Sequence, residues 1–455
     1  MVLARLLLGL GLLICLGVRA QTETATLGDA LQPLTLLQAW RAAQANDPTL
    51  RAAQAAAAVG RERVPQAQAQ LRPSLQVSTN QIQNDSQREA LDYFGKLGQT
   101  HETYVSNSTT LSLRQALYRP QFMAALRQAG HVVANAEAVL LRETQSLAVR
   151  LAGAYFDVLL ARDQLALVAA QTRFLETQLD AAGKSFTRGT GTRTDVDETR
   201  ARVDLNRAQQ LEARQQVELT RRQLMAMLNQ PFGELARLGP LRFDHADLVA
   251  TGLDEWLDAA AQASPDLLAQ QALLEAAREE IARTQAAHLP TLDLVAQVQD
   301  SRSENATSPQ TGYRNKSFGV QLNVPLYSGG YASSAQRQAL ADYERQGALL
   351  EASRHVLGVR VYKEFRGATE GVARVKALEV AVQSADVALD SARKSLAAGV
   401  RTTVDVLNAE QLRVQSLRDL AQARYNMLMA SVRLHALANR VDEAMMAKLG
   451  ASLSQ

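Results

Sequence analysis

Two very long helical stretches, at about 120–187 and 331–398, constrain the fold of this chain more than any other feature. In each stretch, apolar or small residues recur at alternating spacings of three and four, which is the heptad seam of helices that pack nearly parallel to a partner. The seams consist of Leu165, Val168, Thr172, Leu175, Leu179, Ala182 and Phe186 in the first stretch and of Val375, Leu378, Val382, Ala385, Leu389, Ala392 and Leu396 in the second. About 68 residues at ~1.5 Å per residue make a rod of roughly 100 Å, which no compact globule needs.

The sequence contains the same tight turn twice. GTGTRTDVDETRA occupies 189–201 and GVRTTVDVLNAEQ occupies 399–411, and both place glycine, threonine and Asp-Val ahead of a helical run. Further matches at nearly the same offset, such as Leu117-Tyr118 with Leu326-Tyr327, extend the similarity on both sides of the turn. The sequence therefore predicts two copies of one structural unit.

Each predicted unit has the same order of parts. A helix at about 34–72, or 253–288, ends at a proline, and two strands with alternating apolar and polar residues follow. A long helix, the tight turn and a returning helix complete the unit. The first unit is predicted at 21–229, with strands at about 74–84 and 103–118, the long helix at about 120–187 and the returning helix at about 193–229. The second unit is predicted at 253–439, with strands at about 291–300 and 313–327, the long helix at about 331–398 and the returning helix at about 403–438. A linker at 230–252 joins the two units, and a C-terminal tail is predicted at 440–455.

Residues 1–20 have the composition of a secretory signal peptide. Arg5 precedes a short apolar run, and Val18-Arg19-Ala20 ends in a small residue suited to cleavage. The run is shorter than the ~20 apolar residues that span a bilayer. We therefore expect this segment to be removed on export together with Cys15, the one cysteine of the sequence. Lipidation of Cys15 is an alternative that the bulky residue before it disfavours.

Charge and composition argue against several other functions. Without Arg5 and Arg19 the chain has 47 basic and 46 acidic residues, so it lacks the basic excess that nucleic-acid binders usually show. The six histidines do not have the spacing of metal ligands, and no phosphate-binding loop or catalytic triad can be argued from the sequence. We therefore expect no catalytic residues, no cofactor, no metal and no nucleic-acid partner, and an enzyme is not expected.

The four predicted strands have one apolar and one polar face, and they are about as long as the ~9–11-residue strands of membrane β-barrels. Four strands cannot close a barrel, because the smallest known barrels have ~8. An open sheet edge in lipid would leave backbone groups unpaired, at several kcal/mol each. Either the strands form a soluble sandwich or several copies of the chain combine them. The heptad seams also need partners, and they favour an oligomer.

Two copies of this order of parts resemble the TolC family, the outer-membrane channels of tripartite efflux pumps and type I secretion. The segments that carry the resemblance are AYFDVLLARDQLAL at 154–167, NVPLYSGG at 323–330, GVRTTVDVLNAEQ at 399–411 and LAQARYNML at 420–428. The resemblance covers the chain from about 34 to 439. It implies an α+β membrane protein: a homotrimer with a 12-stranded outer-membrane β-barrel, four strands per chain, continuous with a long periplasmic α-helical barrel.

The residue types of the repeated turn are typical of a structural role. Both turns contain Thr-x-x-Asp, the spacing of a capping box, in which the threonine oxygen and the acid each accept a backbone hydrogen bond. Thr192 and Asp195 are the pair in the first turn. Gly189 and Gly399 suit the left-handed position that follows a helix. These features predict two sharp helix–turn–helix tips.

The resemblance adds a gate to this structural role. In the family these turns lie at the periplasmic tip, where the helices coil inward, and a contact between arginine and a neighbouring acid holds the tunnel shut. The matching gate positions in this chain are Thr194, Asp195, Arg401, Asp405 and Asn408. Asn408 stands where the family has a second acid, and Leu396 stands where it has a tyrosine. The mouth is therefore expected to carry fewer carboxylates.

The tips also resemble positions at which the family docks its adaptor. These positions are Arg188, Gly189, Thr190, Ala398, Gly399 and Val400. The implied partners are two further copies of the chain, a periplasmic adaptor (membrane fusion) protein, an inner-membrane transporter of the ABC, RND or MFS type, and outer-membrane lipid. We expect a passive exit duct for efflux or type I secretion in the bacterial outer membrane, extending into the periplasm. The alternative is a soluble periplasmic coiled-coil adaptor or scaffold.

Overall fold

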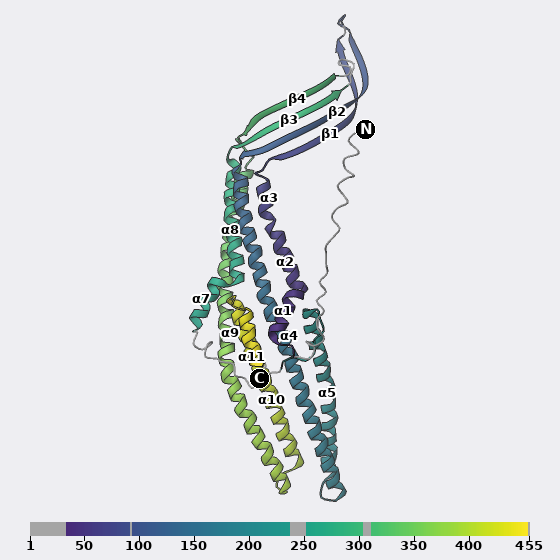
Figure 1. The fold of residues 1–455 in the computed structure, drawn as a ribbon, viewed down its shortest axis with the longest axis vertical. Coiled ribbons are helices and arrows are strands. Elements are labelled where there is room, and N and C mark those ends of the chain that lie inside the picture. Colours follow the sequence, from purple (N-terminus) through teal and green to yellow (C-terminus); the bar gives the residue numbers. More distant parts are fainter. Residues whose placement is uncertain (1–32, 92, 237–251, 304–310, 454–455) are drawn as a thin grey trace, which may run out of the picture.

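The computed structural model describes residues 33–91, 93–236, 252–303 and 311–453. These residues form an elongated molecule with a β-sheet at one end and two helical hairpins at the other (Figure 1). The predicted signal peptide lies outside the described residues. Within them, no helix is both long enough and apolar enough to cross a membrane.

Four antiparallel strands form the sheet in the order β1-β2-β3-β4, so neighbours in the sequence are neighbours in space. The strands are β1 (Ser74–Leu91), β2 (Leu97–Tyr118), β3 (Thr291–Ser303) and β4 (Thr311–Asn323). The predicted strands at about 74–84 and 103–118 were too short, because β1 and β2 remain paired as far as Leu91 and Leu97. β2 begins to pair with β3 only at Ser106, so the outer part of β1 and β2 is a two-stranded ribbon.

Alternation along the strands gives the sheet two chemically different faces. One row on the apolar face consists of Leu75, Leu113, Ala296 and Phe318, and the next row on the polar face consists of Gln76, Ser112, Gln297 and Ser317. Phe318 is 76 % exposed in the single chain although it lies on the apolar face. The described residues therefore supply no layer that covers the apolar face at this position.

An ion cluster connects the sheet to the first long helix. Asp293 of β3 is 3 % exposed, and it accepts hydrogen bonds from Arg119, next to the start of α4, and from Arg114 of β2. The Arg119 Nε–Asp293 Oδ1 distance is 2.8 Å. Hydrogen bonds to two arginines compensate for removing the carboxylate from water. The cluster therefore fixes where the strands turn into helices.

Two antiparallel hairpins of long helices lie beyond the sheet. α4 (Pro120–Thr187) pairs with α5 (Arg193–Leu228), and α9 (Tyr331–Ala397) pairs with α10 (Thr403–Leu437). α10 also packs against α4, so the helices lie side by side in the order α5, α4, α10, α9 (Figure 1). The predicted seams are largely buried: Leu175 is 4 % exposed and Leu389 is 4 % exposed.

The helix that precedes each strand pair is broken, although a single helix was expected in each case. The first region contains α1 (Leu36–Asn46), α2 (Pro48–Arg61) and α3 (Arg63–Ala69), and the second contains α7 (Leu253–Ala263), α8 (Pro265–Gln285) and a 3₁₀ turn, η2 (Ala286–His288). Asp47 ends α1 and caps α2 by accepting from the Leu50 backbone N–H. Pro48 cannot donate to the preceding turn, so the break occurs there.

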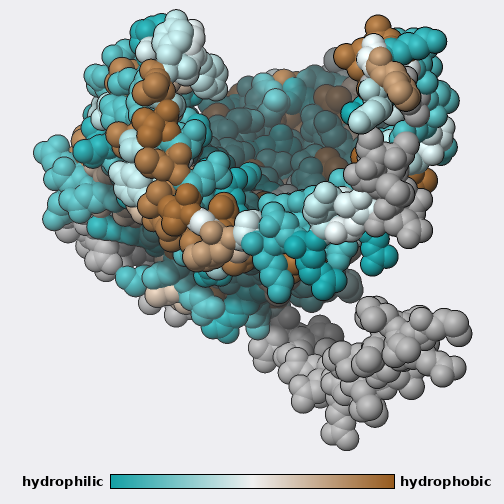
Figure 2. Space-filling view, turned by 90° about the horizontal axis from the view of Figure 1, so that it is seen from above, coloured by the Kyte–Doolittle hydropathy of each residue, from teal (hydrophilic) through white to brown (hydrophobic). Residues whose placement is uncertain are grey.

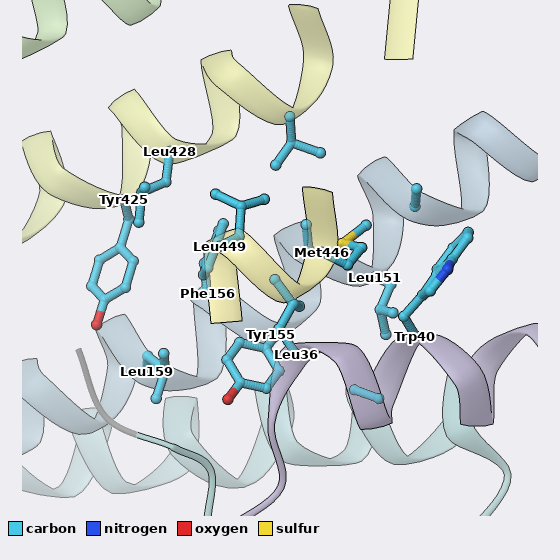
Figure 3. Packing of buried hydrophobic residues seen from close by; sticks show 14 of the residues in the cluster. Leu36, Trp40, Leu151, Tyr155, Phe156, Leu159, Tyr425, Leu428, Met446 and Leu449 are labelled. Atoms are coloured by element: carbon cyan, nitrogen blue, oxygen red, sulfur yellow. The ribbon is translucent and has the colours of Figure 1, made fainter. Parts of the chain in front are cut away.

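The main core lies where α1, α4, α10 and the C-terminal helix α11 (Glu443–Leu453) meet (Figure 3). Trp40, Tyr155 and Phe156 are the largest of its fully buried side chains. Met446 and Leu449 of α11 are 0 % and 1 % exposed. Residues 440–455 were predicted to be a tail, but the apolar side chains of α11 complete this core.

Candidate functional site

The tip of the α4–α5 hairpin is a compact turn of five residues. α4 ends at Thr187, and Gly189 adopts a left-handed backbone with φ of 76°. The backbone N–H groups of Thr190 and Gly191 then donate to the Ser185 carbonyl at 3.0 and 3.1 Å. These bonds satisfy a carbonyl at the end of the helix that would otherwise have no partner. The turn is thereby held rigid.

The predicted capping box begins α5. The Asp195 N–H donates to Thr192 Oγ1 at 3.1 Å, and Asp195 Oδ2 accepts from the Thr192 N–H at 3.2 Å. This reciprocal pair satisfies two of the donors that a helix N-terminus leaves open. The Oδ2 oxygen of Asp195 is therefore occupied within its own turn. Thr194, one residue earlier, is exposed.

The α9–α10 tip repeats this backbone. Gly399 has φ of 76°, and the Val400 N–H donates to the Ser395 carbonyl at 3.0 Å. The Thr402 N–H donates to Asp405 Oδ2 at 2.9 Å, which completes the second capping box. These hydrogen bonds from Thr402, its backbone first and its hydroxyl second, lower the pKa of the Asp405 carboxyl. The structural interpretation of the repeated turn is thus confirmed at both tips.

The two tips differ in how their arginines are paired. Arg193 forms an ion pair with Asp197 one turn along α5, with Nε 3.1 Å from Oδ2. Arg401 is exposed, and among the residues that the structure describes its side chain has no ion-pair partner. Asp195 and Arg401 are not paired within the single chain. At their ends the two tips are separate (Figure 1).

Asn408 contacts the other hairpin a little above the tips. Its Oδ1 accepts from Arg202 Nη2 of α5 at 3.2 Å, and the same Nη2 donates to Glu198 at 3.0 Å. Sequence reasoning did not identify Arg202. The sequence feature that could have identified Arg202 is its position seven residues after Asp195, which places both residues on one face of α5. Leu396 packs beside Leu389, Ala392 and Val406 rather than offering a hydrogen bond.

The positions expected to dock an adaptor lie at the far end of both hairpins. Arg188, Thr190 and Ala398 are exposed, and Val400 is 80 % exposed. The described residues contain no group of three or more His, Cys, Asp or Glu side chains arranged to hold a metal ion. The arrangement at the tips can therefore supply shape, charge and hydrogen bonds to a partner.

A sheet with one apolar face, continued by two long helical hairpins with rigid tips, is the architecture of an outer-membrane channel subunit. The sequence model described as "Outer membrane efflux protein" matches residues 39–230 and 256–440. The chain belongs to this family, as the resemblance to TolC predicted.

Individual relatives are similar over almost the whole chain. The alkaline protease secretion protein AprF of Pseudomonas aeruginosa is 34 % identical, with 90 % of this chain and 85 % of the relative covered. The proteases secretion protein PrtF of Dickeya chrysanthemi is 33 % identical, with 93 % and 92 % covered. The outer membrane protein TolC of Escherichia coli K12 is 27 % identical, with 93 % and 86 % covered.

Solved structures share the fold at lower identity. A membrane protein from Pseudomonas aeruginosa superposes with a TM-score of 0.77 at 20 % identity, covering 91 % of this chain and 93 % of that one. The outer membrane protein VceC from Vibrio cholerae gives 0.74 at 20 % identity, with 89 % and 96 % covered. The chain is thus an outer-membrane channel protein of the efflux and type I secretion class. A soluble adaptor is excluded.

Proposed function

We propose that three copies of this chain form a passive exit duct through the outer membrane: a 12-stranded β-barrel continuous with a periplasmic barrel of helices, with each chain contributing two copies of one structural unit. The observation that carries the proposal is that the chain has two different open edges along its whole length. β1 is one edge of the sheet and β4 is the other. In the helical layer one edge is formed by α5 near the tips and by α2 and α3 near the sheet, and α9 is the other edge.

Both helical edges expose apolar side chains that a neighbouring copy would cover. On α5, Leu205 and Leu211 are 63 % and 61 % exposed. On α9, Val359, Val380 and Val387 are 70 %, 61 % and 67 % exposed. An edge of one kind that meets an edge of the other kind gives a head-to-tail contact, and such contacts generate a closed ring when the rotation from one copy to the next closes. Seen from above, the molecule curves around a hollow, which suits one segment of a ring (Figure 2).

Closure of the sheet favours the same assembly. Each unpaired backbone group of an edge strand in lipid costs several kcal/mol, so β1 of one copy is expected to pair with β4 of the next. Four strands per chain are too few for a barrel, and twelve lie well within the observed range. The number three itself comes from the resemblance to the TolC family.

The cargo we propose is a secreted protein, such as a protease. AprF and PrtF are named for protease secretion, and they are 34 % and 33 % identical to this chain. The duct would work with a periplasmic adaptor, bound at the exposed tip positions, and with an inner-membrane transporter. A transporter of the ABC type suits protein secretion, and RND or MFS types would suit efflux of small molecules.

The tips would form the gate of the duct. Within the described part of the single chain the side chain of Arg401 makes no ion pair, and we propose that it pairs with Asp195 of an adjacent hairpin in the trimer. Asp405 would add one carboxylate per copy to the mouth, and Thr194 and Asn408 would complete the gate positions. Because Arg202 already contacts Asn408, that position would tie the two hairpins together rather than add charge.

Substitution on the two sheet faces tests the barrel. Phe318→Arg, midway along β4 on the apolar face, should abolish trimer recovery from outer membranes, because a cation at the bilayer midplane of a barrel costs ~2–4 kcal/mol. Ser317→Arg on the polar face is the matched control and should be tolerated. The measurement is the mass of the detergent-extracted oligomer, together with protease secretion in a host that lacks its own outer-membrane component. Recovery of wild type as a periplasmic monomer, or equal tolerance of both substitutions, would contradict the proposal.

A further inference from the structure

Glu410 of α10 is a buried carboxylate in the interface between the two hairpins. It is 4 % exposed. It lines a small cavity of about 90 Å³ with Gln171 and Leu175 of α4 and with Arg202 and Asn206 of α5. Glu410 therefore belongs to one hairpin and is covered by the other. Neither the repeated turn nor the heptad seam explains an acid at this position.

The charge of Glu410 is incompletely compensated. Its Oε1 lies 3.7 Å from Arg413 Nη1, and its Oε2 lies 3.9 Å from Arg393 Nη2; both distances exceed a hydrogen bond. Among the described groups, the buried Oε2 has no hydrogen-bond partner. Both arginines have other contacts, since Arg413 donates to Asp386 and Arg393 lies 5.0 Å from the centre of the Phe174 ring.

A carboxylate in this environment opposes the packing that buries it. Removing a charged group from water without full hydrogen bonding is unfavourable, and the effect is lost once water can reach the group. Separation of the hairpins would expose Glu410 to solvent. The ionised side chain therefore destabilises the packed arrangement relative to a separated one.

We propose that Glu410 is a positioning residue that limits how stably the α9–α10 hairpin packs on the α4–α5 hairpin and so biases the gate toward opening. This inference rests on the proposed function, because it assumes that the hairpins separate when the duct opens. Glu410 acts through the interface that carries Leu175, Val203 and Leu407, just above the tips. It contacts no cargo.

The burial of Glu410 determines whether acidification strengthens or weakens the packing of the two hairpins. Desolvation raises the pKa of the Glu410 carboxyl, against the opposing charges of Arg413 and Arg393 and with a small contribution from Asp386. Arg202 of α5 faces the same cavity, and α4 contributes only neutral groups to it. Protonation is therefore more favourable in the packed arrangement. As the pH falls from above the raised pKa toward the ordinary value of 4.5, packing gains stability and the gate closes.

The test compares wild type, Glu410→Gln and Glu218→Gln as full-length trimers. The Glu410→Gln change keeps the shape of the side chain and removes its charge, whereas Glu218 is exposed on α5 and serves as the matched control. Single-channel recordings in planar bilayers measure open probability at neutral and mildly acidic pH. Hydrogen–deuterium exchange over residues 402–413 measures the packing of α10 independently of conduction.

We expect Glu410→Gln to lower the open probability several-fold at neutral pH and to slow hydrogen exchange over 402–413. Acidification, which lowers the open probability of wild type, should have little further effect on this variant. Glu218→Gln should match wild type in all three. Unchanged or faster exchange in Glu410→Gln, with normal trimer yield, overturns the inference. If wild type itself forms no channels, the proposed function fails, and the exchange comparison still decides whether Glu410 opposes packing.

Discussion

At the tip of the α4–α5 hairpin, Arg193 has an acidic partner in its own helix, whereas Arg401 at the tip of the α9–α10 hairpin forms no ion pair with any residue that the structure describes. The two turns share the left-handed glycine, the threonine cap and the aspartate that completes the capping box. A satisfied arginine holds its own turn, and an unsatisfied one is available to a neighbour. The comparison teaches that the backbone of a tip and its binding capacity are set by different residues.

The largest effect should come from changes to the shared backbone. Gly189→Ala and Gly399→Ala each force a side chain into a left-handed conformation, which costs ~1–2 kcal/mol. Both should speed hydrogen exchange in the turn by a similar factor and weaken adaptor capture. The comparison fails if only one of the two turns responds.

Removal of the caps should have a somewhat smaller effect. Thr192→Ala and Thr402→Ala each remove the side-chain acceptor of a capping box, at a cost of ~1 kcal/mol. The first turn of α5 or α10 should fray, and exchange should rise over the three residues after each threonine. Thr192→Ser and Thr402→Ser are the controls that should restore protection. Fraying confined to α10 would mean that the two caps are not equivalent.

Removal of the arginine at each tip should affect channel conductance differently at the two tips. An exposed ion pair contributes only ~0.2–1 kcal/mol, but three copies would add together in a trimer. Arg401→Ala should raise single-channel conductance without lowering trimer yield, whereas Arg193→Ala should leave conductance unchanged. If Arg401→Ala also leaves the conductance of wild type unchanged, the second turn is a helix cap and nothing more.

Acidification should have the smallest effect on the second tip. The pKa of Asp405 is lowered, so its contribution to the cap is fully present above its ordinary value of 3.8 and is lost only as the pH falls through the lowered pKa. Exchange protection of the α10 N-terminus, corrected for intrinsic rates, should therefore not fall between about pH 7 and pH 5, and protonation of Glu410 would only increase it. Loss of protection within that range would show that another group stabilises this tip.

Local patterns predicted the features that depend on local interactions. Glycine, threonine and aspartate at fixed spacing specify a turn whatever surrounds it, and both turns were therefore correct. Heptad spacing likewise placed Leu175 and Leu389 in seams. The bounds of β1 and β2 could not be predicted, because residues beyond about 84 are polar on both faces, and their pairing continues only because the partner strand is already in register.

Interactions between hairpins were beyond the reach of sequence patterns. Arg202 and Asn408 lie 206 positions apart, and no periodicity relates them. The burial of Glu410 depends on where α4 and α5 lie, which a charged residue in a helix does not reveal. α11 was missed for a related reason: Met446 and Leu449 become core residues only because α1 supplies a complementary surface.

The two-stranded ribbon formed by the outer parts of β1 and β2 has a practical consequence for work on living cells. Tyr93 and Phe94 at its end are 100 % and 91 % exposed, and their rings contact each other. The helices of an outer-membrane channel lie in the periplasm, so this end of the sheet faces the medium. Exposed turn tips tolerate insertions far better than packed segments do. An epitope placed between Phe94 and Leu97 would be displayed on the bacterial surface, where antibodies could count assembled ducts on intact cells.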